Sequence, residues 1–127
     1  MPEPHCHQRL LRYRAGPRAL ARLRRDGLGP GSIGAVVGPA SGPRWLALAG
    51  LDQALLTTDL LSRGRILLAG ASAGAWRMVA FASRDPLGAH QRLLDGYVRQ
   101  VFVKGETPAG VSRAYAEVLA EVIGDDG

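Results

Sequence analysis

A serine flanked by glycines stands near the middle of the chain. Residues 65–76 read R-I-L-L-A-G-A-S-A-G-A-W, so a short apolar run leads directly into a G-x-S-x-G motif centred on Ser72. In a nucleophile elbow a buried strand ends and a helix begins just after the serine, whose hydroxyl then projects from the sheet edge. Gly70 and Gly74 suit such a turn because the strand and the helix pack too closely there for side chains. We therefore predict that Ser72 is a catalytic nucleophile.

A serine nucleophile also needs hydrogen-bond donors for the negative charge that develops on the substrate oxygen. The helix that opens near Ala73 would offer free backbone N–H groups at its N-terminus. A second source is the loop G-P-A-S-G at residues 38–42, which begins with Gly38 after a short β-branched run. We expect the amides of Ser41, Gly42 and Ala73 to form an oxyanion hole, although an ordinary turn rich in Gly and Pro is the alternative for this loop taken alone.

The apolar pattern predicts an α/β fold that could place these two loops together. Short apolar runs indicate strands, and periodic apolar residues with capping signals indicate helices. Strands separated by helices imply a parallel sheet flanked by helices, with the two loops at corresponding strand ends. Two strands are few for such a sheet. The expected strands are residues 33–37 and 66–69, and the expected helices are 17–27, 44–56, 73–83 and two that begin at Pro86 and Pro108.

The last two helices differ in how cleanly their apolar residues are spaced. The final helix has an i, i+3, i+4 stripe that runs from Val111 to Val122. With so little sheet in the chain, we expect this stripe to lie uncovered, and the isolated chain to aggregate. In the helix after Asp85-Pro86 we expect one apolar face made of Leu87, Leu94, Tyr97, Val98 and Val101.

Composition indicates one soluble globular domain. The chain has 127 residues, 46% hydrophobic and 21% charged, with a net charge of +5. All of its 16 basic residues except Lys104 are arginine, and many of them cluster near the N-terminus with no interleaved aromatic residue beyond Tyr13. A solvated basic helix explains this better than a nucleic-acid-binding arm, so no nucleic acid is expected as a partner.

The remaining signals exclude several classes of protein. Cys6 is the only cysteine, which rules out an internal disulfide and favours a reducing, cytoplasmic location. His5-Cys6-His7 cannot easily converge on one ion, so we expect no metal site and no cofactor. Neither a signal peptide nor a transmembrane segment is visible. We expect residues 1–16 to be a flexible tail and residues 17–127 to be the folded part.

The two loops together resemble those of the patatin-like phospholipases, in a bacterial branch of that family. There a G-x-x-G-G-P-K-W loop follows the first strand and a G-x-S-x-G-A-W-R elbow follows the next. Here the loop reads G-P-A-S-G-P-R-W from Gly38, and the elbow reads G-A-S-A-G-A-W-R from Gly70. The resemblance covers residues 13–124 and looks like the N-terminal part of such a domain. It implies a three-layer fold and a lipid acyl hydrolase in which Ser72 works with an aspartate instead of the usual histidine.

The resemblance also implies an acyl-ester substrate, such as a lipid, and leaves room for peripheral contact with a membrane.

The sequence departs from the pattern of the patatin-like phospholipases at two places. Ser41 replaces the second glycine of the loop, which would cost about 1–2 kcal/mol if that position is left-handed. The family's aspartate belongs to a downstream D-G-G or D-G-A motif, whereas Asp126-Gly127 follows a predicted helix. We therefore expect a domain truncated after two strands, and little esterase activity from this chain alone.

Two other functions remain open at this point. An α/β-hydrolase would need an aspartate and then a histidine after Ser72, and His90 is the only later histidine. Its position on a helix suggests a solvent-facing residue instead. A non-catalytic α/β remnant or interaction fragment, binding a partner through uncovered helix faces, is the alternative outside enzymes.

Overall fold

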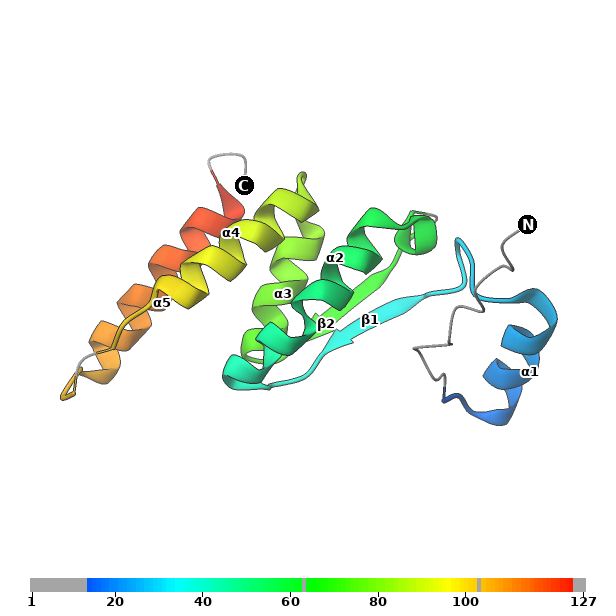
Figure 1. Ribbon diagram of the computed structural model, residues 1–127, viewed down its shortest axis with the longest axis horizontal. Coiled ribbons are helices and arrows are strands. Elements are labelled where there is room, and N and C mark those ends of the chain that lie inside the picture. The colour runs from blue at the N-terminus through cyan, green and yellow to red at the C-terminus, as the bar shows by residue number, and fades with distance from the viewer. Residues whose placement is uncertain (1–13, 63, 103, 125–127) are drawn as a thin grey trace, which may run out of the picture.

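Nine elements follow one another along the part of the chain that the computed structural model describes, which is residues 14–62, 64–102 and 104–124 (Figure 1). Five are α-helices, two are strands and two are 3₁₀ helices, and the strands are separated by helical segments as the sequence predicts. In order they are α1 (Pro17–Asp26), β1 (Ala35–Gly38), η1 (Gly42–Leu48), α2 (Ala49–Thr57), η2 (Asp59–Leu61), β2 (Leu67–Gly70), α3 (Ala73–Ala82), α4 (Pro86–Arg99) and α5 (Pro108–Ile123).

The two strands form a parallel pair, which confirms the prediction of a mixed α/β fold with a parallel sheet. Ala35 pairs with Leu67, and the register continues to Gly38, which pairs with Gly70. Both strands therefore end at the same level, and the chain leaves both at the same edge of the sheet. Each strand runs slightly later in the sequence than predicted, because it extends into the glycine that opens the following loop.

Only one face of this sheet is covered within the described residues. Helix α3 packs against both strands, and Val36 and Leu68 are half-buried. The residues that alternate with them are exposed, because a strand's side chains point to opposite faces in turn. This open face is formed by Ala35, Val37, Leu67 and Ala69.

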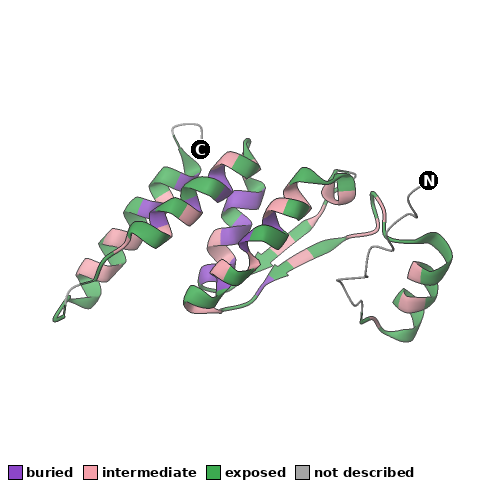
Figure 2. Cartoon of the chain, viewed as in Figure 1, coloured by how far each residue is buried: buried purple, intermediate pink, exposed green. Residues whose placement is uncertain are grey.

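The buried residues gather where α2, α3, α4 and α5 meet, as Figure 2 shows. Trp45 of η1 lies at the centre of this core, with its ring edge-on to Tyr97 at 5.4 Å between centroids. Helix α5 packs along α4 and buries Val118 and Val122. The expectation that the α5 stripe is uncovered is therefore wrong for these two residues.

The predicted apolar face of α4 is confirmed at Leu94 and Tyr97, which pack against the core, and is wrong at its other three residues. Leu87 is 43% exposed, Val98 is 63% exposed, and Val101 lies beyond the helix. The face that packs against its neighbours includes small residues, and α4 and α5 approach closely at Gly96. A Cβ atom on Gly96 would lie 3.0 Å from a methyl group of Val118. The buried residues of α4 are Ala89, His90, Leu93 and Gly96.

Two predicted helices lie close to their expected bounds, but one of them is partly 3₁₀ and the other buries no residue. The helix predicted over residues 44–56 begins as the 3₁₀ helix η1 and becomes α-helical only at Ala49. Helix α1 starts with Pro17 and ends at Asp26, and the predicted stop residue Gly27 follows it with a left-handed φ of 73°. It buries none of its residues and stands apart from the other helices in Figure 1. No helix in the described residues is long and apolar enough to cross a membrane.

Candidate nucleophile elbow

Ser72 occupies the turn between β2 and α3, with a backbone conformation that non-glycine residues seldom adopt. Its φ and ψ angles are 52° and −130°, and among the described residues it alone has a positive φ without being glycine. The residue is exposed, and α3 begins immediately after it. Strain of this kind costs about 1–3 kcal/mol and is typical of functional sites. A strand, a strained turn and a helix thus follow one another here, in the order that a nucleophile elbow requires.

Two glycines, Gly38 and Gly74, allow the backbone of the elbow to touch the backbone of the loop after β1, and a third, Gly70, allows the strand and the helix of the elbow to approach each other. A Cβ atom on Gly38 would lie 2.6 Å from the carbonyl oxygen of Gly74, and one on Gly74 would collide with the carbonyl of Gly38. A Cβ atom on Gly70 would lie 2.6 Å from the backbone of Ala75. The Ala71 amide also donates to the Gly38 carbonyl at 3.0 Å. The two loops therefore meet at one edge of the sheet.

The loop over residues 38–42 places its left-handed residue at Gly42. Gly42 has a φ of 51°, whereas Ser41 has a φ of −136°, which any residue adopts without strain. The serine that replaces the second glycine of the family's loop therefore has no left-handed penalty. The Ser41 hydroxyl is buried without a hydrogen-bond partner among the described residues. Arg44, three residues after Ser41, is exposed.

The amides predicted to form the oxyanion hole are not used within the fold. Within residues 14–62, 64–102 and 104–124, the N–H groups of Ser41, Gly42 and Ala73 donate to no acceptor. The next amide of α3, on Gly74, donates to the carbonyl of Ala71 at 3.0 Å. An amide without an internal partner at a helix N-terminus can donate to an anionic oxygen.

A buried ion pair that the sequence did not reveal lies behind the elbow. Arg77 of α3 donates from Nε and Nη2 to the two carboxylate oxygens of Asp52 in α2, at 2.6 and 2.5 Å. The Nε2 atom of His90 in α4 lies 3.3 Å from Asp52 Oδ2. Since a carboxylate can only accept, this nitrogen carries the proton. Asp52 and His90 are fully buried and Arg77 is 5% exposed.

These two donors determine the charge of Asp52. Burial raises the pKa of the Asp52 carboxyl, but the hydrogen bonds from His90 and Arg77 outweigh it, so the pKa lies below its ordinary value. The carboxylate is therefore ionised beside the Arg77 guanidinium. Three neighbouring polar atoms in this region stay buried without a partner among the described residues: Trp45 Nε1, Arg77 Nη1 and His90 Nδ1.

The interpretation of His90 as a solvent-facing residue is wrong. His90 is completely buried, with its ring edge-on to that of Trp45 at 6.1 Å between centroids. Its hydrogen-bonding partner is Asp52, and no described residue forms a hydrogen bond with the hydroxyl of Ser72. His90 therefore does not serve as the base of a Ser-His-Asp triad in this structure. A charged residue within an apolar stripe, as Asp52 is beside Trp45, is the sequence signal that could have indicated this network.

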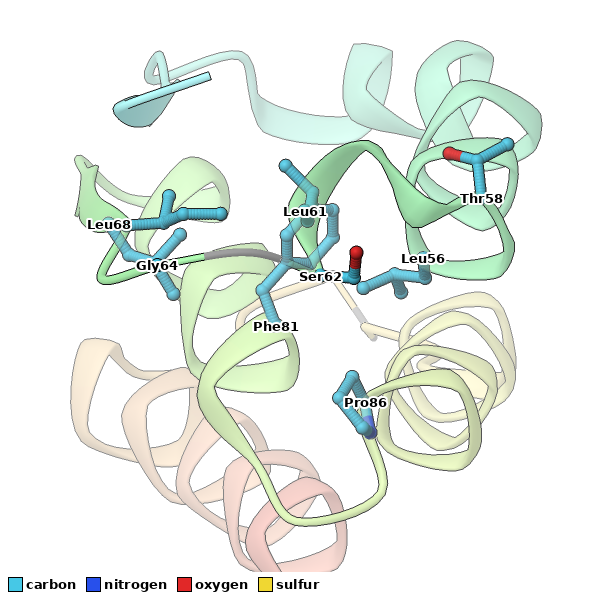
Figure 3. Close-up of a pocket in the computed structure, with 9 residues that line it drawn as sticks. Leu56, Thr58, Leu61, Ser62, Gly64, Leu68, Phe81 and Pro86 are labelled. Carbon is cyan, nitrogen blue, oxygen red and sulfur yellow. The ribbon is translucent and has the colours of Figure 1, made fainter. Parts of the chain in front are cut away.

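A pocket of about 300 Å³ lies away from the elbow. Figure 3 shows Leu61, Phe81 and Pro86 directed toward it. Phe81 is near the end of α3, whereas Ser72 precedes its first residue, and the rise of an α-helix separates them by roughly 13 Å. The pocket therefore does not adjoin the candidate nucleophile. Its lining is Leu56, Thr58, Leu61, Ser62, Gly64, Ile66, Leu68, Phe81 and Pro86.

Two sets of residues considered in the sequence lie outside the described part of the chain. They are the His5-Cys6-His7 triplet and Asp126-Gly127. Among the described residues, no group of three or more His, Cys, Asp or Glu side chains could hold a metal ion.

Comparison with known proteins returned no match. No family model matches the chain, and no curated protein or solved structure is significantly similar to it. The geometry of the elbow is therefore the basis for any functional interpretation.

Proposed function

We propose that this chain carries the nucleophile and the oxyanion-hole amides of a serine acyl hydrolase of the patatin-like class. The observation that supports this most strongly is the left-handed Ser72 between a parallel strand and a helix. A serine held in this way costs stability and contributes nothing to the core, which is understandable if its hydroxyl is needed. The substrate is an acyl ester, with lipids as the first class to test.

The elbow would act in two steps of acyl transfer. The Ser72 hydroxyl attacks the ester carbonyl, and the resulting oxyanion accepts hydrogen bonds from the amides of Ala73, Gly42 and Ser41. Release of the alcohol leaves an acyl-enzyme, which water hydrolyses. Each donor of an oxyanion hole is worth about 10²–10³ in rate. The contact between Gly38 and Gly74 supports this assignment because it keeps the donor loop beside the nucleophile.

The attack also needs a base that takes the proton from Ser72. The resemblance to the patatin-like phospholipases implies an aspartate from a D-G-G or D-G-A motif, and no described residue is assigned this role. The same resemblance implies a three-layer domain, in which helices would also cover the open face of the sheet. Such a layer would bury Val37 and Leu67.

A fluorophosphonate probe tests the proposal directly, because it reacts covalently with activated serines. We expect the intact protein to be labelled at Ser72, as located by peptide mass spectrometry, and the Ser72→Ala variant to lose this label. Any turnover of p-nitrophenyl esters, which we expect to be low for these 127 residues, should disappear in the same variant. Labelling of another serine, such as Ser83 or Ser112, with Ser72 unmodified would contradict the proposal and favour a non-catalytic role for this turn.

A further inference from the structure

The buried ion pair joins the two chain segments that carry the proposed catalytic groups. Asp52 lies on α2, which continues from η1 and therefore from the loop over residues 38–42. Arg77 lies on α3, which begins directly after Ser72. Both hydrogen bonds between them are short and shielded from water. A guanidinium and a carboxylate that share two parallel hydrogen bonds fix each other's orientation as well as their separation.

Helix α3 contacts the segment that runs from the 38–42 loop through α2 at two points on the same side. Gly74 touches the backbone of Gly38 and Pro39, and Arg77 reaches Asp52. Gly74 and Arg77 are three residues apart, which places them one above the other on a helix surface. Helix α3 also packs against both strands, α4 and α5, but apolar packing fixes an orientation less sharply than paired hydrogen bonds do. The contacts at Gly74 and Arg77, one turn apart, limit the small rotations about the helix axis that such packing still allows.

Rotation of α3 would redirect the groups at its N-terminus. Ser72 and Ala73 are rigidly continuous with the helix, since the carbonyl of Ser72 accepts the amide of Ala75 at 2.8 Å. Turning the helix would therefore move the Ser72 hydroxyl and the Ala73 amide relative to the amides of Ser41 and Gly42. An error of about 1 Å in such an arrangement can cost about 10²-fold in rate.

We propose that Arg77 is a positioning residue for the elbow. By its paired hydrogen bonds to Asp52 it fixes the rotation of α3, and with it the direction of the Ser72 hydroxyl and the Ala73 amide toward the 38–42 loop. His90 assists by holding the same carboxylate oxygen from α4. The effect on catalysis depends on the proposed hydrolase function, whereas the effect on the geometry of the two loops does not.

A double substitution separates positioning from stability. Asp52→Leu/Arg77→Met replaces the pair with apolar side chains of similar size, a change that is often neutral or stabilising for a buried pair. Here it also leaves His90 Nε2 without its acceptor, so a variant that keeps Asp52 is needed beside it. Apolar contacts fill the space without fixing an orientation. Arg77→Lys is a milder second variant, because lysine keeps the charge but cannot form the paired hydrogen bonds. Arg99→Met is the matched control, since it removes an exposed ion pair with Glu121 between α4 and α5.

Two measurements on the intact protein test the proposal. In the double variant and in Arg77→Lys, we expect amide hydrogen exchange to become faster over residues 38–42 and 70–75, with α5 unchanged. We also expect the rate of Ser72 labelling by the fluorophosphonate to fall by about 10- to 100-fold, as a misplaced nucleophile implies. Arg99→Met should alter neither measurement.

The outcomes distinguish this proposal from the proposed function. Unchanged exchange over both loops in a folded variant would overturn the positioning role, whatever the labelling shows. If the variants exchange faster over both loops but the parent protein is never labelled at Ser72, the positioning role is supported and the hydrolase assignment is overturned. If the double variant does not fold, exchange in Arg77→Lys decides the question.

Discussion

Ser72 combines an unfavourable backbone conformation with an exposed hydroxyl that forms no hydrogen bond among the described residues. Glycine adopts a positive φ without steric cost, whereas alanine keeps the penalty of a Cβ atom. We expect Ser72→Gly to raise the free energy of unfolding by about 1 kcal/mol relative to Ser72→Ala. Chemical denaturation of the two variants measures this difference. Equal stabilities would show that the serine is not strained at this turn.

The pKa of Asp52 predicts how stability depends on pH. Hydrogen bonds from His90 and Arg77 lower this pKa, so the folded state favours the ionised carboxylate more than the unfolded state does. This contribution is fully present above the unfolded pKa of about 3.9 and is lost as the pH falls through the lower folded pKa. Protonation leaves Arg77 as a buried charge, and breaking such pairs costs about 3–5 kcal/mol.

The measurement compares the parent protein with Asp52→Asn between pH 5 and pH 2. We expect the parent to lose more of its free energy of unfolding over this range than the variant, because the other carboxyl groups titrate in both. Parallel curves for the two proteins would contradict the assignment of a lowered pKa to Asp52.

At the scale of the elements, the close contact of α3 with the loop after β1 leaves no room for a side chain at Gly74. A methyl group there would collide with the carbonyl of Gly38, and overpacking of this kind costs about 1–3 kcal/mol. Gly50 in α2 is the matched control, since nothing lies within 4 Å of an added Cβ atom. We expect Gly74→Ala to lower the unfolding temperature and Gly50→Ala to raise it, because alanine is the better helix former. Thermal unfolding followed by circular dichroism measures both changes. If the contact were absent, the two variants would shift the unfolding temperature equally.

Local signals in the sequence were sufficient to predict the strands, the elbow and most helix starts. Proline at the first helical position and glycine at the turn act on the residues next to them, so no knowledge of distant contacts is needed. The buried face of α4 depends instead on which helix it meets. Large apolar residues such as Val98 remained exposed, whereas Gly96 became buried because Val118 of α5 approaches it.

The ion pair behind the elbow escaped prediction for the same reason. Asp52, Arg77 and His90 lie on three different helices. The position of Asp52 in an apolar stripe hints at its burial but does not identify its partners. Their burial follows from how α2, α3 and α4 pack together. No spacing within a single element encodes that arrangement.

At the scale of the whole molecule, the open face of the sheet exposes large apolar side chains to water. Val37 is 69% exposed and Leu67 is 67% exposed, and contiguous apolar surface promotes association. We expect Val37→Lys/Leu67→Glu to reduce self-association of the 127-residue chain in sedimentation velocity. The free energy of unfolding should change by only about 0.5 kcal/mol, because both side chains already contact water.

The control for this prediction is Val98→Lys, which replaces an exposed valine on α4, outside the sheet. A scattered apolar side chain contributes little to association, so this variant should sediment like the parent. A reduction of equal size in both variants would indicate that the loss of any exposed apolar side chain, and not of the open face in particular, controls association.

The contact between Gly38, Gly70, Gly74 and their neighbours also restricts how the proposed site could diversify. Any side chain at these three positions meets backbone atoms, so none of them is open to variation that tunes the choice of substrate. Ala40 and Ala71 stand beside them with exposed side chains. Adaptation of the site to a new acyl group, by natural selection or by directed evolution, would therefore have to proceed through exposed positions such as Ala40 and Ala71. The three glycines around them would stay constant.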